Sequence, residues 1–334
     1  MSQGQCPACG GGARDTILEV GSREAAQHFV LEEADRVRHE ALERHIRVLW
    51  GGERCRVVRC RACGFAHAEP FVGGDAAFYG LAYDRTHYPV DKWEHRVTLA
   101  ALAALPGQPR TVLEIGAGDG AFLSRLPPHA FRLEDLFATE YSDYGRRAVQ
   151  ALGIRCEAVD VRALSPEHDG RYDVICLFQV LEHLDRLDEV FARLAALARP
   201  GGSLFVGVPN DRCVAFFEQH GALLDMPPNH LSRWSREALR RFGDRHGWRL
   251  EDHRVEVEPL VPFARRFLSY RYLRATQRPG SIPNRIRRLP ASRIRLALDA
   301  LWVALLLPSA AAALARLRRE AGGDSQWARF ARVA

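Results

Sequence analysis

The chain is poor in cysteine and lysine, and it lacks any long uncharged apolar run. Eight cysteines in 334 residues are too few for a disulfide-stapled scaffold, so their spacing matters more than their number. The first residues form neither a basic nor an apolar segment, so we expect no secretory signal and a cytoplasmic protein. No stretch of eighteen residues is free of charge. The nearest, Leu296–Ala315, contains Asp299 and Pro308, so we expect no membrane-spanning helix.

The overall composition is that of a globular protein. Hydrophobic residues make up 47% and charged residues 26%, which excludes wholesale disorder, and the length allows about two domains. Lys92 is the only lysine, and because alanine is abundant we attribute the preference for arginine to codon bias. The formal net charge of +6, taken as an average, is too weak to indicate a nucleic-acid or membrane partner.

Short apolar runs alternate with helical segments in the middle of the chain. Strands are predicted at Thr111–Ile115, Leu136–Glu140, Ile154–Val159, Tyr172–Phe178 and Ser203–Val208. Helices between them are predicted at Gly120–Leu126, Asp143–Leu152 and Leu181–Ala198. A helix at Ser235–His246 and strands at Trp248–Val257 and Gln326–Val333 follow. This alternation is typical of βαβ units, so we expect an α/β fold with a parallel sheet covered on both faces.

The most informative segment is the loop after the first of these strands, which has glycines at alternate positions: Gly116, Gly118 and Gly120. Glycines let a ligand lie against bare backbone, and the loop alone also fits a dinucleotide-binding fingerprint. Glu114, just before the loop, would repel a pyrophosphate but suits a ligand with an ammonium group. Glu140, at the end of the second strand, can accept both hydroxyls of a ribose. A ribose ligand with a cation and no phosphate indicates S-adenosylmethionine.

Residues 111–210 resemble the core of class I S-adenosylmethionine-dependent methyltransferases. The resemblance rests on the glycine loop, Glu140, and the motifs at Ala158–Val161, Tyr172–Ile175, Val180–Leu184 and Arg199–Gly202. It implies a doubly wound, Rossmann-like sheet that is mostly parallel, with an antiparallel last strand.

The same resemblance implies roles for individual residues. Glu114 would hold the methionine amino end and Glu140 the ribose. Asp160 and Val161 would flank the adenine, and Phe178 would lie near the cofactor. The loop that passes under the cofactor would consist of Gly116, Ala117, Gly118 and Gly120.

Two Cys-x-x-Cys pairs, each followed by glycine, lie within residues 1–70: Cys6 with Cys9 and Cys60 with Cys63. Four thiolates are the closed ligand set of a structural zinc site. We expect zinc rather than redox chemistry because there are two pairs and neither follows a βαβ strand. Cys55 is interpreted as a bystander that could replace one ligand. The remaining cysteines are expected to be small core residues: Cys156, Cys176 and Cys213.

The cysteine pairs and the aromatic segment Phe78–Tyr83 resemble a bacterial subgroup of these methyltransferases with an N-terminal zinc ribbon. Members of that subgroup methylate sugars, glycolipids and other secondary metabolites. The spacer Ser22–Trp50 has apolar residues at helical spacing and is predicted to be a helical insertion. Three tyrosines in the connector could cap the cofactor, although we favour a packing seam between domains: Tyr79, Tyr83 and Tyr88.

Two histidines are candidates for catalysis. His183 follows the fourth strand, and His230 lies in a loop after the fifth strand, bordering the expected acceptor pocket. Either could serve as a base or be bonded within the fold, and we favour His230 slightly as base or acceptor ligand. Some quinone-type relatives hold magnesium with acids beside the pair Glu182–His183. The matching upstream position here is Gln179, so we expect no catalytic metal.

Residues 259–298 contain ten arginines and no acidic residue. The aromatic residues among them suit either a nucleic-acid surface or an anionic membrane. The adjoining apolar face of Leu296–Leu307 favours the membrane, because a nucleic-acid binder does not need it. A helical hairpin that packs on the sheet as a lid over the acceptor stays an open alternative.

The sequence predicts a cytoplasmic S-adenosylmethionine methyltransferase with a structural zinc and a small-molecule acceptor, such as a sugar or a lipid-linked intermediate. Contact through 259–320 would place it at the inner face of the membrane. The alternatives are an RNA methyltransferase that uses the arginine-rich segment, a nicotinamide-dinucleotide oxidoreductase and a scaffold without turnover. The predicted parts are a zinc-ribbon domain (1–70), a connector (71–109), the methyltransferase core (110–258 with 323–334) and a basic, apolar helical insertion (259–322).

Overall fold

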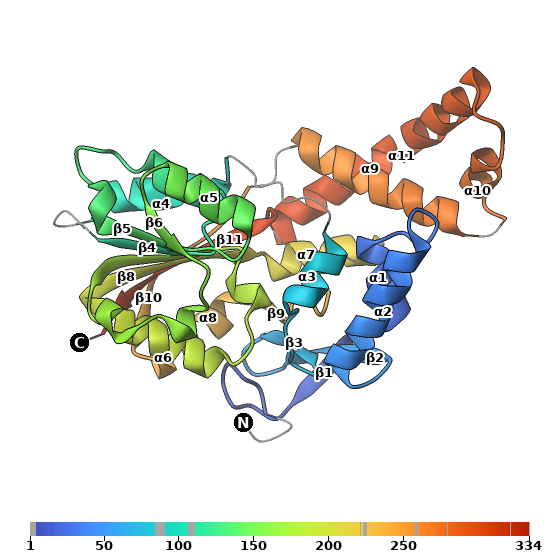
Figure 1. The fold of residues 1–334 in the computed structure, drawn as a ribbon. Coiled ribbons are helices and arrows are strands. Elements are labelled where there is room, and N and C mark those ends of the chain that lie inside the picture. The colour runs from blue at the N-terminus through green and yellow to red at the C-terminus, as the bar shows by residue number, and fades with distance from the viewer. Residues whose placement is uncertain are drawn as a thin grey trace. The chain divides into compact units, whose positions relative to one another are not determined.

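The computed structural model describes residues 5–83, 91–105, 111–220, 222, 226–257, 260–278, 280–320 and 322–333. The chain divides into two compact units (Figure 1). The first comprises Met1–Pro209, Asp225–Arg254 and Ser325–Ala334, and the second comprises Asn210–Leu224 and Val255–Asp324. The segment predicted as an insertion, 259–322, lies within the second unit, which also takes in residues 210–224.

The first unit contains a seven-stranded sheet with the order β10-β11-β8-β7-β4-β5-β6 (Figure 1). The pairs β6–β5, β5–β4, β4–β7 and β7–β8 are parallel, and β11 runs antiparallel to β8. This confirms the predicted α/β fold with a mostly parallel sheet. The strands are β4 (Val112–Ile115), β5 (Leu136–Thr139), β6 (Arg155–Glu157), β7 (Tyr172–Phe178), β8 (Ala198–Pro209), β10 (Trp248–Val255) and β11 (Ser325–Arg332). The helices beside them are α4 (Trp93–Ala103), α5 (Asp143–Ala151), α6 (Leu187–Leu197) and α8 (Arg236–Arg245).

Helices cover both faces of this sheet because successive residues of a strand point to opposite sides. On one face, Leu113 and Leu177 are buried in a cluster with residues of α6 and α8. On the other face, Val112 and Val174 are buried with residues of α4 and α5. Figure 1 shows these helices on opposite sides of the sheet. Full burial of such side chains contributes about 1.5–3 kcal/mol each, so the two layers stabilise the sheet whose strand ends carry the site.

The helix predicted over Gly120–Leu126 does not form. The structure has a short 3-10 turn over Leu123–Arg125 instead, and Leu126 is extended. Pro127 follows directly, and a proline disfavours the helical conformation of the residue before it.

The helix predicted over Leu181–Ala198 is broken. A 3-10 turn covers Leu181–His183, α6 begins four residues after it, and Arg186 between them has a left-handed φ of +45°. Asp185, in the break, accepts a hydrogen bond from the Arg162 guanidinium (2.8 Å). This tertiary contact holds the chain in a conformation that local helix propensity does not predict.

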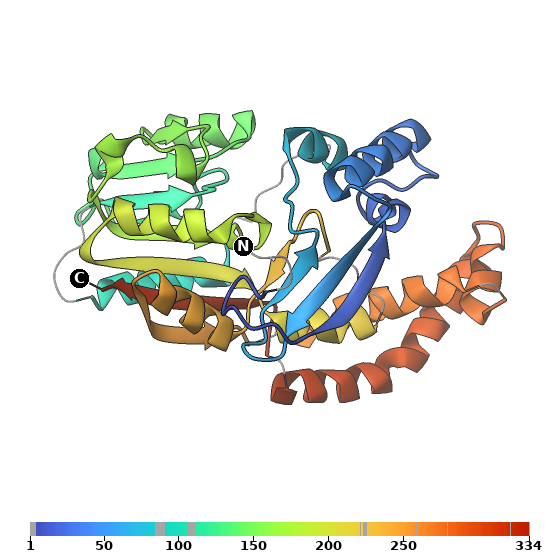
Figure 2. The same cartoon turned by 90° about the horizontal axis from the view of Figure 1, so that it is seen from below.

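A four-stranded sheet in the same unit has the order β1-β2-β3-β9, and Figure 2 shows β1 and β2 side by side in blue. The two strands are antiparallel, with Arg14 opposite Cys60, and the helical segment predicted between the cysteine pairs leaves from their far end as α1 and α2. Asp35 begins α2 by accepting from the backbone N–H of Arg38 (3.0 Å). The elements are β1 (Arg14–Gly21), α1 (Ser22–Phe29), α2 (Arg36–Trp50), β2 (Arg54–Cys60), β3 (Ala66–Glu69), α3 (Ala76–Ala82) and β9 (Ser232–Arg233).

The second unit has an apolar core of its own. Its helices are α7 (Asp211–Gln219), α9 (Leu260–Gln277), α10 (Ile282–Arg287) and α11 (Arg293–Glu320), and α9 packs against α11 (Figure 1). Phe216, Phe263 and Leu317 are buried together in this core. By length and composition alone, the part of α11 over Arg293–Leu317 is apolar enough to cross a membrane, with a mean hydropathy of 1.8. Length and composition do not by themselves show that a helix spans a membrane, so the expectation of no membrane-spanning helix stays a prediction.

Leu177 lies in the central strand β7 and is fully buried. We expect Leu177→Ala to lower the free energy of unfolding by about 3 kcal/mol, because the change removes apolar contacts and leaves a cavity. Urea denaturation followed by tryptophan fluorescence measures this loss. The exposed Leu133 provides a matched control, for which Leu133→Ala should cost less than about 0.5 kcal/mol. Equal costs for the two variants would contradict the position of Leu177 in the core.

Candidate active site

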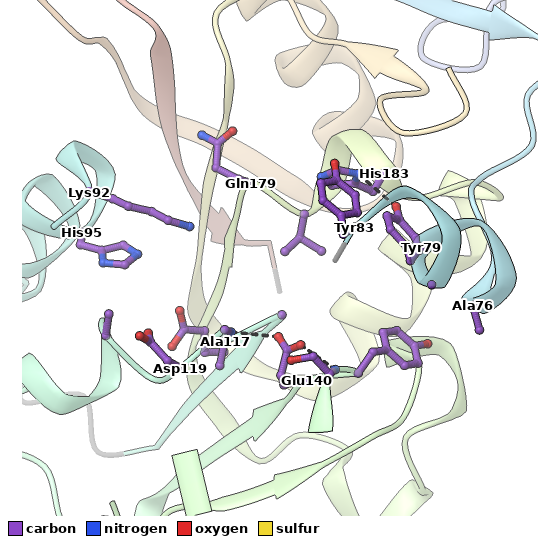
Figure 3. A pocket seen from close by; sticks show the side chains of 18 residues that line it. Ala76, Tyr79, Tyr83, Lys92, His95, Ala117, Asp119, Glu140, Gln179 and His183 are labelled. Atoms are coloured by element: carbon purple, nitrogen blue, oxygen red, sulfur yellow. Dashed lines mark hydrogen bonds between the residues drawn. The ribbon is translucent and has the colours of Figure 1, made fainter. Parts of the chain in front are cut away.

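A cavity of about 660 Å³ lies at the carboxyl ends of β4, β5 and β7, where parallel α/β sheets bind their ligands. Its walls come from the loops that follow these strands, from α3 and from the start of α4 (Figure 3). The lining residues that matter for chemistry are Tyr79, Tyr83, Lys92, His95, Glu114, Gly116, Ala117, Gly118, Asp119, Glu140, Tyr141, Gln179 and His183.

The glycine loop forms the floor of the cavity directly after β4. Gly116 has a φ of +68°, and a Cβ built there would lie 2.5 Å from Cγ2 of Val180. Both the backbone conformation and the close approach therefore require glycine. The predicted loop residues Gly116, Ala117 and Gly118 line the cavity, and Gly120 continues the turn with a φ of +82°.

Glu140 connects the loops after β4 and β5. Its carboxylate accepts hydrogen bonds from the backbone N–H of Gly118 (2.9 Å) and from that of Ser142 (2.8 Å). Each carboxylate oxygen has a second lone pair, so both oxygens can still accept from a ligand. The backbone bonds hold the carboxylate in one orientation at the cavity wall, where it can bind the two hydroxyls of a ribose.

Two carboxylate oxygens at the glycine end of the cavity are buried without a hydrogen-bond partner among the described residues. They are Oε2 of Glu114 and Oδ1 of Asp119. Burial raises the pKa of the Glu114 carboxyl well above its usual range, and the nearby Lys92 opposes this shift. A buried polar group without a partner costs free energy that a ligand cation would recover. This end of the cavity therefore fits the ammonium group of S-adenosylmethionine.

Lys92 is a site residue that the sequence did not identify. It precedes α4, and Figure 3 shows its side chain extending into the cavity, on the side of His95 and Asp119. A cation close to two carboxylates suits a zwitterion, whose carboxylate would meet Lys92 while its ammonium meets the acids. The signal was present in the sequence, because a single lysine among so many arginines is unusual.

His183 lines the cavity and is held by the backbone. Its Nδ1 lies 2.8 Å from the carbonyl oxygen of Asn229. A carbonyl only accepts, so Nδ1 carries a proton, and in the neutral imidazole the lone pair is then on Nε2. The hydroxyl of Tyr79 lies 3.3 Å from the same Nδ1 and can accept from it as well. Nε2 lies 3.9 Å from Oε1 of the buried Glu182. In its neutral form the imidazole is therefore held in the tautomer that can take a proton at Nε2.

His230 lies beside His183, with the ring centroids 4.6 Å apart, but it is not among the described residues that line the cavity. The structure therefore brings the two predicted histidines together and puts His183, not the slightly favoured His230, at the wall. The ligand atoms of Glu182, His183 and His230 lie within 4.8 Å of one another, a spacing that could also hold a metal ion.

Gln179 follows β7 with a left-handed φ of +60°, which is rare for residues other than glycine. Its backbone N–H donates to the carbonyl of Gly207 (2.8 Å), and its amide donates to Oε1 of Glu94 (3.1 Å). The residue is held from both sides and lines the cavity. Backbone strain of this kind costs about 1–3 kcal/mol and often marks functional positions.

The aromatic connector both packs and lines the cavity. Tyr79 and Tyr83 are cavity residues, and Figure 3 shows them near His183. Phe29 of α1 contacts Tyr83 at 5.7 Å and Phe78 at 5.4 Å between ring centroids, so the helical segment between the cysteine pairs supports this wall. The third tyrosine, Tyr88, lies outside the described residues.

Three residues predicted to contact the cofactor are not among the described residues that line the cavity. Val161 and Phe178 are buried in the two core clusters. Asp160 accepts hydrogen bonds from the guanidinium of Arg162 (2.6 Å) and from the hydroxyl of Tyr141 (3.3 Å). Tyr141 itself lines the cavity, so Asp160 is one contact away from it. Their roles stay predictions.

The two cysteine pairs meet in space. The Sγ atoms of Cys6 and Cys63 are 3.6 Å apart, as are those of Cys9 and Cys60, and all four lie within 4.8 Å of one another. Tetrahedral zinc with bonds of about 2.3 Å separates its sulfurs by about 3.8 Å. Cys55 is buried elsewhere, and burial raises the pKa of its thiol to about 12.

The two cysteine turns also have the same backbone. Gly10 donates to the carbonyl of Cys6 (2.8 Å), as Gly64 does to that of Cys60 (2.9 Å). Both glycines have positive φ values near 75°. The matched turns direct two pairs of thiols toward one point, which is the arrangement of a four-cysteine metal site.

The sheet, the glycine loop and the cavity define a class I S-adenosylmethionine-dependent methyltransferase. The chain belongs to the family described as "Methyltransferase domain", which matches residues 86–253, half of its length. This confirms the predicted class of enzyme.

Several known proteins are similar to the chain. The ubiquinone biosynthesis O-methyltransferase of Burkholderia pseudomallei is 26% identical over 179 residues, covering 50% of this chain and 75% of the relative. The ubiquinone biosynthesis O-methyltransferase of Marinobacter nauticus is 32% identical over 120 residues, covering 35% of this chain and 46% of the relative. Among solved structures, the 1,6-didemethyltoxoflavin-N1-methyltransferase of Burkholderia thailandensis has a TM-score of 0.43 at 15% identity, covering 73% and 80%. The geranyl diphosphate C-methyltransferase of Streptomyces coelicolor has a TM-score of 0.41 at 15% identity, covering 71% and 76%.

Calorimetric titration with S-adenosylhomocysteine tests the cofactor end of the cavity. We expect Glu140→Ala to weaken binding at least tenfold, because hydrogen bonds to a charged group are worth about 1.5–3 kcal/mol. Lys92→Met should weaken it about tenfold, since it removes the cation that faces the ligand carboxylate. Glu134→Ala changes an exposed acid and should leave the affinity unchanged. An affinity of Glu140→Ala equal to that of the wild type would contradict this placement of the ribose.

Proposed function

We propose that the protein transfers the methyl group of S-adenosylmethionine to a hydroxyl group of a small molecule, with His183 as the base. The observation that carries the proposal is the fixed tautomer of His183 at the cavity wall, with Nδ1 bonded to the Asn229 carbonyl. When bound, S-adenosylmethionine supplies a methyl group that is already activated on a sulfonium. The protein therefore has to position the acceptor oxygen and remove its proton.

Four residues at one end of the cavity would bind the cofactor. Glu114 and Asp119 would bind the ammonium, Lys92 the carboxylate, and Glu140 the ribose hydroxyls. The fit rests on the buried oxygens of Glu114 and Asp119 that lack a hydrogen-bond partner among the described residues, and on the carboxylate orientation of Glu140 that Gly118 and Ser142 impose. Asp160 and Val161 would support the adenine from behind this first layer, and Phe178, which packs against His95, would lie near the cofactor.

His183 would take the proton of the acceptor hydroxyl at Nε2. The carboxylate of Glu182, 3.9 Å from that nitrogen, would stabilise the resulting imidazolium. His230 packs against the ring and would keep it in place or receive the proton next. We therefore assign the base to His183 and a positioning role to His230.

The acceptor end is aromatic. Tyr79 and Tyr83 line the cavity near His183, and such rings suit the flat face of a sugar or an aromatic ring. Relatives named ubiquinone biosynthesis O-methyltransferases support a hydroxyl acceptor. We propose a sugar or a lipid-linked intermediate as the acceptor and a cytoplasmic site of action, where unpaired thiols persist. A pyrophosphate cofactor is disfavoured, because it would meet the buried Glu114.

We further propose that Cys6, Cys9, Cys60 and Cys63 hold one structural zinc ion. The support is the spacing of their sulfurs and the matched backbone of the two turns. The ion would join the start of the chain to the end of β2, so it would stabilise the first unit rather than take part in methyl transfer.

The enzyme is incubated with S-adenosylmethionine labelled on its methyl group and with a panel of phenols, sugars and glycolipids, and in parallel with RNA. We expect label on a small-molecule oxygen and none in RNA. His183→Asn should lower kcat about 100-fold and change the affinity for S-adenosylhomocysteine less than twofold, because the cofactor contacts remain. His129→Asn replaces an exposed histidine and serves as the matched control. Transfer to RNA, or an unchanged kcat in His183→Asn, would contradict the proposal.

Metal analysis of the purified protein should give one zinc per chain. Cys60→Ser should lose the metal and lower Tm by at least about 5 °C, because binding of a structural zinc contributes directly to folding. Cys55→Ser removes a buried cysteine outside the cluster and should keep the zinc. A wild-type protein without metal, or a Cys60→Ser variant that retains it, would refute the assignment.

A further inference from the structure

We propose that the helices α9, α10 and α11 of the second unit bind the surface of an anionic phospholipid bilayer. We call these helices the basic hairpin. The proposal concerns the second unit alone and does not depend on the acceptor proposed above.

The apolar residues of the basic hairpin are exposed where α11 begins. The exposed fractions are 71% for Ile294, 68% for Leu296, 59% for Leu301 and 66% for Leu305. Only 6% of the most apolar window of α11 is buried. Exposed leucines at this density on one helix are unusual for a surface that stays in water, and they indicate a partner that accepts apolar groups.

Exposed arginines lie beside these leucines. Arg285, Arg287, Arg288 and Arg293 are all exposed, and within the described ranges none of them pairs with a carboxylate. The nearest acid on α11, Asp299, accepts a hydrogen bond from the hydroxyl of Tyr272 (2.7 Å). Cationic side chains can bind the anionic headgroups of a bilayer, and the apolar side chains beside them can enter its acyl-chain region.

The structure favours binding at the interface over a span. Farther along α11, Ala310, Leu314 and Leu317 are buried in the core of the second unit. Only residues 294–308 are free to enter lipid, which is about 22 Å of helix, whereas the hydrocarbon layer is about 30 Å thick. A span would therefore require the second unit to give up part of its own core.

Two of the aromatic residues that could stack on nucleic-acid bases are buried inside the second unit. Phe263 and Phe267, which alternate with arginines in the sequence, are 0% and 1% exposed. Arg266 lies over the ring of Phe217 and pairs with Asp324, so it too is used inside the unit. The most exposed side chains at the start of α11 are leucines and isoleucine beside arginines, and RNA has no counterpart for these apolar groups.

The full-length protein is sedimented with vesicles of phosphatidylglycerol and phosphatidylcholine, and with vesicles of phosphatidylcholine alone. We expect it to bind the anionic vesicles only, less tightly as salt is raised. The double variant Leu301→Asp, Leu305→Asp should lower the partition coefficient at least tenfold. The combined change of Arg285, Arg287, Arg288 and Arg293 to Gln should also lower it at least tenfold.

Matched controls change the same kinds of residue on the first unit. Leu31→Asp with Val37→Asp alters exposed apolar residues, and Arg36, Arg44, Arg132 and Arg249 changed to Gln remove the same charge. Both should bind vesicles as the wild type does. Titration with S-adenosylhomocysteine verifies that every variant keeps a folded first unit, and bromine-labelled acyl chains should quench Trp302 in the wild type but not in Leu301→Asp, Leu305→Asp.

Three results would overturn the proposal. The first is a wild-type protein that does not bind anionic vesicles. The second is full vesicle binding by the double variant Leu301→Asp, Leu305→Asp. The third is a preference for an RNA oligonucleotide over vesicles, with RNA binding unchanged in that double variant. Association that resists both high salt and alkaline extraction would overturn the interfacial geometry in favour of a span.

Discussion

The site depends on one carboxylate that joins two loops. Glu140 accepts from Gly118 after β4 and from Ser142 after β5, so the backbones of adjacent strand ends are held together at the cavity wall. α5 begins beside this link, and a Cβ on Gly145 would collide with the carbonyl of Gly118. The carboxylate of Glu140 and the start of α5 therefore determine the shape of the glycine loop. The same carboxylate keeps lone pairs for a ligand, which lets one residue both build the site and bind at it.

The second constraint is the burial of charge. Glu114 is enclosed by the sheet and the loop, and burial raises the pKa of its carboxyl. Such a group is unfavourable in the free protein and becomes favourable when a cation meets it. Lys92 partly opposes this rise in the pKa, but it makes no hydrogen bond to the buried Oε2 of Glu114. The cofactor end is thus built for a zwitterion, while the opposite end presents the imidazole of His183 beside Tyr79 and Tyr83.

Sequence reasoning succeeded where the information is local. One short sequence pattern contains the strand that leads into the glycine loop, Glu114 and Glu140. His183 and His230 are distant in sequence, but ligands bind at the carboxyl ends of parallel strands, and this rule placed both histidines in the same region. It failed where a contact between distant parts of the chain determines the local structure. The break before α6 depends on Asp185 and Arg162, and the exposure of α11 depends on how the second unit fills its core. Lys92 was missed because its being the only lysine was attributed to codon bias, and because no sequence pattern states which way a side chain points.

The central claim is that the cavity takes S-adenosylmethionine with its ammonium against the buried Glu114. A carboxyl with a raised pKa holds its proton in the free protein at mildly acidic pH and gives it up when the ammonium arrives. Calorimetry of S-adenosylhomocysteine binding in two buffers that differ in ionisation enthalpy measures this release. The predicted result is a proton released by the wild type, with little release and weaker binding in Glu114→Gln. No binding by the wild type, an enthalpy that does not depend on the buffer, or binding of a nicotinamide dinucleotide instead would contradict the account.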